Sequence, residues 1–246
     1  MTRPPGDFWE YLRQATPARI ALGRAGDGLP TRRLLEFELA HARARDAVWT
    51  ELDGEALLLD LAAWQPVLVR SAAPDRRTFL QRPDLGRRLG EVPEPALSSG
   101  DYDATIILAD GLSAGALQVR GAQLCKMLLA APHVRFAPPV VALQARVALG
   151  DEIAARQGAA LAIVLIGERP GLSSFDSLGA YLTFAPQPGA TKDAGRNCVS
   201  NIRADGLSLE EASRRILAIM ALALTIRRTG TALKEDEALE VLPPQA

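Results

Sequence analysis

Apolar and polar positions change their spacing along the chain, and the change divides the sequence near residue 100. Before that point, apolar residues recur among charged ones at helical spacing from Thr31 to Val48, directly after Pro30. After it, short continuous apolar runs alternate with helical patterns. This alternation is typical of a parallel β-sheet that is covered by helices on both faces. The pattern therefore predicts a helical N-terminal part followed by an α/β part.

The apolar runs after residue 100 predict strands, and the amphipathic segments between them predict helices. We expect strands at Ala104–Ala109, Val140–Gln144, Ala162–Ile166, Tyr181–Phe184 and Val199–Ile202. We expect helices at Ala114–Ala130, Asp151–Gln157 and Leu209–Arg228, the last with a capping-box pattern at Ser208 and Glu211. The predicted fold class is α/β, a Rossmann-like parallel sheet flanked by helices, with a helical N-terminal extension.

The first hundred residues are expected to form a mainly helical N-terminal extension, residues 1–100, followed by an α/β domain over residues 101–246. The apolar residues at 57–61 and 67–69 fit either a helix or a strand pair. Pro93, Pro95, Ser98, Ser99 and Gly100 form a turn-rich joint at the boundary.

Polar residues stand directly after three of the expected strands. Asp110 to Ser113 follow the first, Arg146 and Val147 follow the second, and Glu168 and Arg169 follow the third. In open α/β sheets, ligands bind beyond the carboxyl ends of the strands. The sequence therefore predicts one shared crevice at this edge of the sheet.

Composition and charge exclude several classes of function. A formal net charge of −1 lacks the basic footprint of a nucleic-acid-binding protein. No segment reads as an export signal or a membrane span. Two cysteines, Cys125 and Cys198, are too few for a disulfide framework and are expected to be reduced thiols in the cytoplasm. His41 and His133 alone do not make a metal site, so no metal ligands are expected.

Gly111-Leu112-Ser113-Ala114-Gly115 matches the Gly-x-Ser-x-Gly pattern of a serine nucleophile between a strand and a helix. A serine hydrolase would need a carboxylate and then a histidine downstream of Ser113. His133 is the only downstream histidine, and no carboxylate lies between the two. The favoured interpretation is a tight turn in which Ser113 caps the following helix, with a hydrolase as an alternative.

Three long strings carry a resemblance to a known family. They are Ile166-Gly167-Glu168-Arg169-Pro170-Gly171-Leu172, Asp176-Ser177-Leu178 and Arg196-Asn197-Cys198-Val199-Ser200-Asn201-Ile202. Further matching strings begin at Thr16, Gly23, Arg82 and Asp110 in the same order. The chain thereby resembles the small (light) subunit of ethanolamine ammonia-lyase over about Thr16 to Ile202.

The resemblance implies an adenosylcobalamin-dependent enzyme that converts ethanolamine to acetaldehyde and ammonia by a radical route. It implies that a separate large subunit binds ethanolamine and carries most of the chemistry, while residues 101–246 close over the cobalamin. The positions that match the family's cobalamin contacts are Val147, Glu168 and Cys198, and Arg146 directly precedes the first. No catalytic residue is expected in this chain, and a non-catalytic scaffold subunit is the other alternative.

Physical roles for these residues follow from the chemistry of a corrin ring edged with amides. Glu168 suits the role of an acceptor for amide donors, and Val147 suits contact with the ring. The alternative for Glu168 is an ion pair with Arg169 or Arg146. Cys198 is expected to pack near the cofactor rather than to bind cobalt. The chain has no Asp-x-His-x-x-Gly pattern, so the cofactor is expected to keep its own benzimidazole as the lower cobalt ligand.

Two features of the sequence bear on the cellular compartment of the protein and on the mobility of one of its segments. Some members carry an N-terminal extension that directs them into a bacterial microcompartment, whereas about fifteen residues precede the first matching string here. We therefore expect a cytoplasmic protein, within a microcompartment only if the large subunit supplies the address. The segment Gln187–Asp193 has little apolar anchoring and is expected to be mobile.

Overall fold

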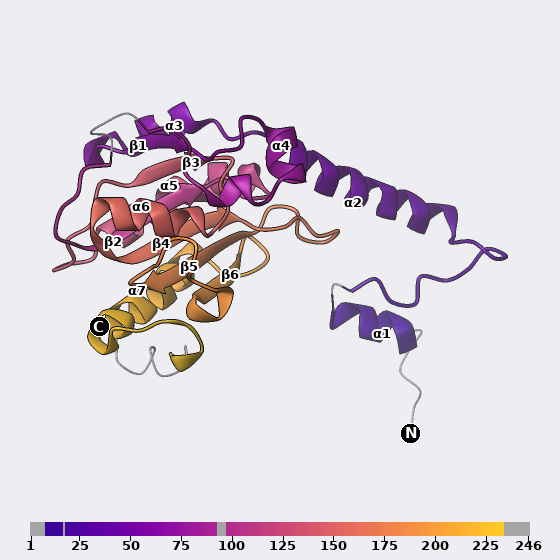
Figure 1. Cartoon of the computed structure of the whole chain (residues 1–246). Coiled ribbons are helices and arrows are strands. Elements are labelled where there is room, and N and C mark those ends of the chain that lie inside the picture. Colours follow the sequence, from indigo (N-terminus) through magenta and orange to yellow (C-terminus); the bar gives the residue numbers. More distant parts are fainter. Residues whose placement is uncertain (1–7, 17, 93–96, 234–246) are drawn as a thin grey trace, which may run out of the picture.

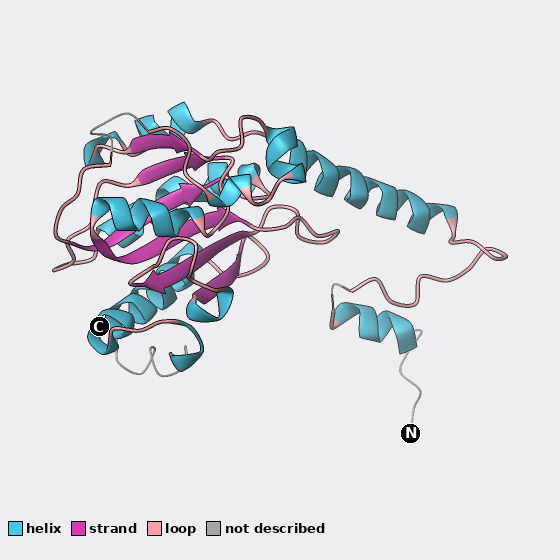
Figure 2. Ribbon diagram, viewed as in Figure 1, coloured by secondary structure: helices cyan, strands magenta, loops and turns pink. Residues whose placement is uncertain are grey.

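Helices and strands follow one another in the order that the apolar pattern predicts (Figures 1 and 2). The computed structural model describes residues 8–16, 18–92 and 97–233. Its strands are β1 (Val67–Arg70), β2 (Tyr102–Ala109), β3 (Val140–Leu143), β4 (Ala159–Gly167), β5 (Leu178–Phe184) and β6 (Asn197–Ile202). Its α-helices are α1 (Phe8–Gln14), α2 (Thr31–Trp49), α3 (Gly54–Asp60), α4 (Arg76–Gln81), α5 (Ala114–Leu129), α6 (Leu149–Gln157) and α7 (Leu209–Ile226).

The strands form one six-stranded sheet in the order β1-β3-β2-β4-β5-β6. The four strands from β1 to β4 are parallel, as expected, but β5 is antiparallel to both of its neighbours. Parallel neighbours need a long crossover, usually a helix, whereas residues 168–177 and 185–196 include no α-helix. The α/β class is therefore confirmed, and the sheet is mixed rather than parallel throughout.

The edge strand β1 comes from the part of the chain that was expected to be an extension. It pairs in parallel with β3, so that Val67 lies opposite Val140 and Arg70 opposite Leu143. The open choice at 57–69 is thus resolved as helix α3 followed by strand β1. Pro93 and Pro95 of the expected joint lie outside the described residues. The division into 1–100 and 101–246 stays a prediction, and the sheet takes one strand from before it.

Helices cover the two faces of the sheet unequally. On one face, α3, α5 and α7 enclose the larger core cluster, to which all of β2, β4, β5 and β6 contribute side chains. On the other face, α6 covers β2 and β4 and encloses a smaller cluster around Ile107, Val164 and Ile153. Beyond α6 on that face, Tyr181 of β5 is half-buried and Cys198 and Ser200 of β6 are exposed. We call this surface the open face of β5 and β6.

The first two helices form an arm that stands away from the sheet (Figure 1). Neither α1 nor α2 has a buried residue, although α2 is 19 residues long. Apolar side chains on the arm are exposed, namely Phe8, Trp9, Tyr11, Leu29, Leu34, Leu35, Phe37, Leu39 and Trp49. The helix expected from Thr31 to Val48 is therefore confirmed, but its apolar side chains are not covered by the chain's own core.

The last helix begins with the cap that its sequence predicts. The Ser208 side chain accepts a hydrogen bond from the Glu211 backbone N–H at 3.2 Å. The Glu211 carboxylate accepts from Arg214 and Arg215 on the next turn, and these hydrogen bonds lower the pKa of Glu211 to about 2. The buried face of α7, including Ile216 and Ile219, then packs on the larger core cluster.

Candidate functional site

The carboxyl ends of β3, β2 and β4 lie side by side, because these strands are parallel neighbours in the sheet. Asp110 follows β2 and is buried. Its carboxylate accepts hydrogen bonds from the backbone N–H groups of Gln144 and Ala145, at 2.9 and 2.8 Å, and from Arg76 Nη1 at 3.2 Å. Burial raises the pKa of Asp110, and these donors oppose the rise. The end of β2 thus fixes the turn that carries Arg146 and Val147.

The backbone after β2 also lies against the end of β4. Leu112 N–H donates to the Gly167 carbonyl at 3.0 Å. Gly111 has a φ of +56°, and a Cβ there would lie 2.2 Å from the Gly167 carbonyl oxygen. Only glycine fits both the conformation and the space. The three strand ends are therefore neighbours, with the chain's own backbone lying between the ends of β2 and β4, and the shared crevice stays a prediction.

Ser113 lies in the expected strand-to-helix turn, but its hydroxyl does not cap α5. The side chain is buried, makes no capping hydrogen bond and donates to the Phe175 carbonyl at 2.8 Å. The capping prediction is wrong because the hydroxyl is turned toward the loop 168–177. A second contact fixes the same loop, since Arg120 donates a hydrogen bond to the Asp176 carboxylate at 3.0 Å.

The structure also contradicts the hydrolase alternative. Ser113 precedes the first turn of α5, whereas His133 follows the last turn and is exposed. A helix of 16 residues separates them, which is about 24 Å at 1.5 Å per residue. The Ser113 hydroxyl therefore has no hydrogen bond to an imidazole in the described structure, since it donates to the Phe175 carbonyl and His41, the other histidine, stacks on Phe37 of α2.

Replacing Ser113 with alanine is expected to lower the free energy of unfolding by about 1 kcal/mol, because one buried hydrogen bond is lost. Turnover of an assembled enzyme is expected to change little. Ser113→Asp distinguishes a helix cap from a hydrogen bond to Phe175. Aspartate can cap a helix, but here it places a carboxylate against the Phe175 carbonyl, so it is expected to lower the free energy of unfolding more than alanine does. The matched control is Ser208→Asp, which keeps a true cap and is expected to be neutral. Urea unfolding measures all three, and a harmless Ser113→Asp would restore the capping role.

Glu168 lies at the end of β4 with its carboxylate over the neighbouring strands. Its Oε2 accepts from Ser177 Oγ at 2.5 Å and from the Asn201 backbone N–H at 3.4 Å. A Cβ on Gly179 would lie 2.8 Å from Oε1, so the absence of a side chain there leaves room for the carboxylate. The alternative of an ion pair with Arg169 or Arg146 is wrong, since neither guanidinium lies within 4.0 Å of this carboxylate in the described structure.

Tyr181 connects Glu168 with Cys198 on the open face, and sequence reasoning gave it no role in the site. Tyr181 lies opposite Val164 on β4 and opposite Cys198 on β6. Burial raises the pKa of the Tyr181 phenol, and a hydrogen bond to the Cys198 side chain and the charge of Glu168 raise it further. The phenol is therefore neutral at physiological pH. Only its alternation with Ala180 and Leu182, which point into the larger core, could have indicated that Tyr181 faces the other way.

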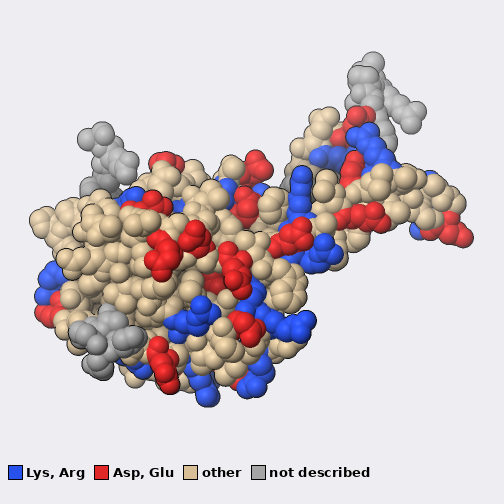
Figure 3. All heavy atoms as spheres, turned by 90° about the horizontal axis from the view of Figure 1, so that it is seen from above, with Lys and Arg blue, Asp and Glu red and all other residues tan. Residues whose placement is uncertain are grey.

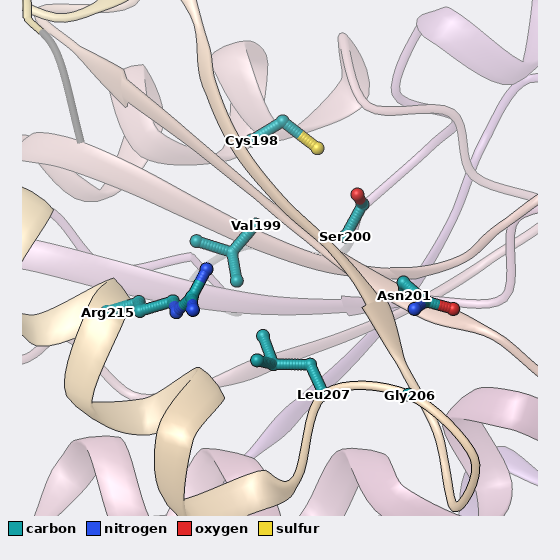
Figure 4. A pocket seen from close by; sticks show the side chains of 7 residues that line it. All are labelled: Cys198, Val199, Ser200, Asn201, Gly206, Leu207 and Arg215. Carbon is teal, nitrogen blue, oxygen red and sulfur yellow. The ribbon is translucent and has the colours of Figure 1, made fainter. Parts of the chain in front are cut away.

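Cys198 and Val199 have opposite surroundings, as neighbours on a strand must. Figure 4 shows Cys198 and Ser200 on one side of β6, and Val199, Leu207 and Arg215 on the other. A hollow of about 470 Å³ adjoins these residues at the outer edge of the sheet. Cys198 is exposed, whereas Cys125 is buried in α5, and burial raises the pKa of the Cys125 thiol to about 12. Cys198 is therefore the thiol that an outside molecule can touch.

Arg146 and Val147 lie at the start of α6, beside the open face. Val147 is half-buried and packs on the margin of the smaller core cluster, as Tyr181 does. The Arg146 guanidinium stacks on the Phe79 ring, with its Cζ 4.4 Å from the ring centroid. Tyr181 thus lies between Glu168 and Cys198 on one surface, and Val147 packs against the same core cluster as Tyr181.

A buried ion pair supports this surface from below. Arg196, directly before β6, donates to both oxygens of Asp151 in the first turn of α6, each at 2.7 Å. Arg196 Nη1 also donates to Thr183 Oγ1 at 2.8 Å. Both charged side chains are almost fully buried, at 2% and 1% exposure. The pair joins α6 to β6 across β5 and sets the start of the strand that presents Cys198.

The described residues contain no group of three or more His, Cys, Asp or Glu side chains placed to hold a metal ion. Among the same residues, no helix is long and apolar enough to cross a membrane. Lys and Arg are interspersed with Asp and Glu over both the body and the arm (Figure 3). The segment 187–193, for which mobility stays a prediction, has a hydrogen-bonded turn from Gln187 to Thr191 with mostly exposed side chains.

Comparison with known proteins assigns the family. The family model described as "Ethanolamine ammonia-lyase light chain (EutC)" matches residues 6–234. The chain belongs to this family. Small subunits of ethanolamine ammonia-lyase from Rhodococcus erythropolis and Bradyrhizobium diazoefficiens (strain JCM 10833 / BCRC 13528 / IAM 13628 / NBRC 14792 / USDA 110) are 50% and 51% identical to it. These matches cover 93% and 92% of the chain and 90% of each relative.

The ethanolamine ammonia-lyase small subunit from Pseudomonas fluorescens (strain Pf0-1) is 45% identical over 260 aligned positions, which cover 100% of the chain and 94% of that relative. The resemblance seen in the sequence is therefore confirmed. The chain is accordingly assigned to the small subunit of a carbon–nitrogen lyase, and the word "small" implies a large-subunit partner.

Proposed function

We propose that this chain binds one side of adenosylcobalamin, which the large subunit of ethanolamine ammonia-lyase covers from the other side. The observation that carries the proposal is the open face of β5 and β6. Glu168, Tyr181 and Cys198 share this face, and Val147, next to Arg146 in sequence, packs against the same core cluster as Tyr181. Four separate elements thus present polar and apolar groups to one surface that no helix of the described chain covers.

The groups on this face fit a corrin ring. A corrin is broad, partly apolar and edged with amide groups, so its binding site needs acceptors, donors and small apolar contacts. Glu168 Oε1 accepts no hydrogen bond within the described chain and is free to accept one from a corrin amide. The neutral Tyr181 phenol and the exposed Cys198 thiol are small polar groups beside it, and Val147 supplies an apolar contact.

The chain's own part in the reaction is to bind and to shield. When bound, adenosylcobalamin supplies the radical with which the deamination of ethanolamine begins. Glu168 and Val147 would hold the corrin in position, and the sheet behind them would exclude water from that side. We assign no catalytic residue to this chain, and we propose that ethanolamine is bound mainly by the large subunit. Neither histidine lies on the open face, so this chain would offer no imidazole to the cofactor there.

The arm supports the proposal of a large partner. Soluble monomers rarely expose large continuous apolar surfaces, and such surfaces mark interfaces. On α2, Leu34, Leu35 and Leu39 are between 41% and 57% exposed, and α1 adds Phe8 and Tyr11 at 64% and 69%. The arm stands clear of the sheet, so a partner can surround it. We propose that the large subunit is this partner.

Replacing Glu168 with glutamine tests the cofactor site. A hydrogen bond to a charged group contributes about 1.5–3 kcal/mol, so the complex is expected to bind cobalamin roughly ten- to a hundredfold more weakly. Turnover at saturating cofactor is expected to recover, because Glu168 takes no part in the chemical step. Titration of adenosylcobalamin into the assembled complex measures the half-saturation point.

The control for this titration is Glu210→Gln, which removes an exposed carboxylate on α7 far from the open face. Glu210→Gln is expected to leave the half-saturation point unchanged. If Glu168→Gln also left it unchanged, Glu168 would serve only Ser177 and Asn201, and the cofactor would lie elsewhere.

The isolated chain is expected to fold but to produce no acetaldehyde from ethanolamine when adenosylcobalamin is supplied. We expect no acid–base pair at the open face, where the carboxylates near Tyr181 among the described residues are those of Glu168 and Asp193. An anaerobic assay without and with the purified large subunit measures the difference. Turnover by the single chain would contradict the proposal, and a complex that bound cobalamin equally well without this chain would favour the scaffold alternative.

The compartment stays a prediction. Neither cysteine is joined in a disulfide, which fits the reducing cytoplasm. We propose a cytoplasmic location, which includes the interior of a bacterial microcompartment.

A further inference from the structure

Three arginines at or next to the carboxyl edge of the sheet have no acidic partner in the described chain. Arg146 follows β3, Arg169 follows β4, and Arg87 ends the short 3₁₀-helix Leu85–Arg87. The structure records no ion pair and no side-chain hydrogen bond for any of these guanidinium groups among the described residues. Other arginines in this body differ, since Arg120 and Arg196 each bond a carboxylate within 3.0 Å.

Local structure holds this arginine cluster in place. Arg146 N–H donates to the Gly86 carbonyl at 2.8 Å, which ties the turn after β3 to the 3₁₀-helix that carries Arg87. The Phe79 ring lies between two guanidinium groups, with Arg146 Cζ at 4.4 Å and Arg76 Cζ at 4.9 Å from its centroid. Arg76 is occupied by Asp110, the Gly111 carbonyl and the Val48 carbonyl. Arg146 is therefore fixed on one side and has no partner on the other.

The cluster is electrostatically uncompensated. Arg146 Nε is buried and has no hydrogen-bond acceptor. Burial lowers the pKa of Arg146, and the charges of Arg76, Arg87 and Arg169 lower it further, with Asp110 as the opposing carboxylate. A buried donor without an acceptor and a group of like charges both cost free energy. An anion that binds at Arg146 relieves both costs.

We propose that Arg146, with Arg87 and Arg169, binds a phosphate group of the cofactor. The proposal rests on the proposed function, and it assigns the phosphodiester of the cobalamin nucleotide loop to this cluster. Three features favour this group: it is the anion of the cofactor, guanidinium groups pair with phosphate oxygens in a fork geometry, and the cluster adjoins Val147 and Glu168 in sequence. Free phosphate has the same chemistry and is the other source to distinguish.

The test uses the assembled complex and three ligands that differ in the nucleotide loop. Cobalamin has the phosphodiester and the base, cobinamide phosphate has the phosphate without the base, and cobinamide has neither. Binding is followed by the visible absorption spectrum of the corrin rather than by turnover. Wild-type complex is expected to bind cobalamin and cobinamide phosphate more tightly than cobinamide. Arg146→Ala is expected to weaken the first two roughly ten- to a hundredfold and to leave cobinamide within about threefold.

Exposed members of the cluster and a remote arginine complete the design. Arg87→Ala and Arg169→Ala remove exposed side chains, so they test the cluster even if Arg146→Ala impairs folding. Each is expected to weaken cobalamin binding several-fold and to reduce its dependence on salt. Arg156→Ala, at the far end of α6, is the matched control and is expected to change nothing.

The outcomes separate the two proposals. Equal loss of cobalamin and cobinamide binding in Arg146→Ala would overturn the phosphate role while leaving the cofactor site. Failure of the wild-type complex to bind any of the three corrinoids would overturn the proposed function itself. Inorganic phosphate at millimolar concentration is expected to compete with cobalamin only weakly. Two results together would show a site for free phosphate and overturn the assignment. Inorganic phosphate would compete strongly with cobalamin, and in the absence of phosphate the complex would bind cobalamin no more tightly than cobinamide.

Discussion

Asp151→Ala is expected to lower the free energy of unfolding by about 3–5 kcal/mol, because it leaves the Arg196 guanidinium buried without its carboxylate. Arg196 is 2% exposed, and its remaining partners are Thr183 Oγ1 at 2.8 Å and the exposed Asp193 carboxylate at 3.9 Å. Urea unfolding of the purified chain measures the loss. The start of β6 is expected to loosen as well, and with it the presentation of Cys198.

Two comparisons sharpen this expectation. Asp84→Ala breaks an ion pair with Arg82 in which the side chains are 50% and 60% exposed, and the expected cost is much smaller because water screens the pair. The double replacement Asp151→Leu with Arg196→Met removes both buried charges and is expected to recover most of the loss. If Asp151→Ala lowered the free energy of unfolding as little as Asp84→Ala, the expectation would be wrong, and water would have to reach the pair of Asp151 and Arg196.

Gly111→Ala is expected to lower the free energy of unfolding by about 2–6 kcal/mol. A non-glycine residue at its φ of +56° costs about 1–3 kcal/mol. Its Cβ would also lie 2.2 Å from the Gly167 carbonyl oxygen, and overpacking of this kind costs about 1–3 kcal/mol. Because the obstacle is backbone rather than a flexible side chain, the ends of β2 and β4 must separate. Thermal unfolding measures the effect.

The other glycine of the same five-residue string is the matched control. Gly115 lies in α5, and a Cβ there would meet nothing within 4 Å. Gly115→Ala is therefore expected to stabilise the protein by about 0.5–1 kcal/mol, because alanine is the better helix former. Equal effects of the two substitutions would mean that the turn after β2 is less constrained than its geometry indicates.

The elements of the fold could be predicted from apolar periodicity, but the direction of β5 could not. The runs around Ile106, Val141 and Ile163 are each followed by a helical pattern, and they form the parallel part of the sheet. The runs around Leu182 and Val199 have the same apolar character, yet β5 is antiparallel to its neighbours. Strand direction depends on whether a connection contains a crossover helix, and the composition of the strand does not record it.

The strand-end residues of the candidate site could be derived from the sequence pattern, whereas Cys198, within β6, came from the family resemblance and Tyr181, within β5, was missed. Asp110, Arg146 and Glu168 stand after strands, so their convergence follows from topology. Tyr181 lies inside β5, and its exposure arises because α6 does not extend over that strand. Ser113 was placed correctly but given the wrong partner, because a sequence pattern cannot tell whether a hydroxyl turns to its own helix or to the Phe175 carbonyl.

The exposure of the arm bears on when its helices α1 and α2 become stable. Neither α1 nor α2 buries a side chain, and α2 touches the body near its C-terminal end, where the Val48 carbonyl accepts a hydrogen bond from Arg76. Most helical stability in proteins comes from the packing of an apolar face, and most of the arm has no such packing in the described chain. Backbone amides of α2 are therefore expected to exchange with deuterium far faster than those of β4 in the free chain, and to become protected only when a partner covers them. Folding of the arm and assembly of the enzyme would then be a single event.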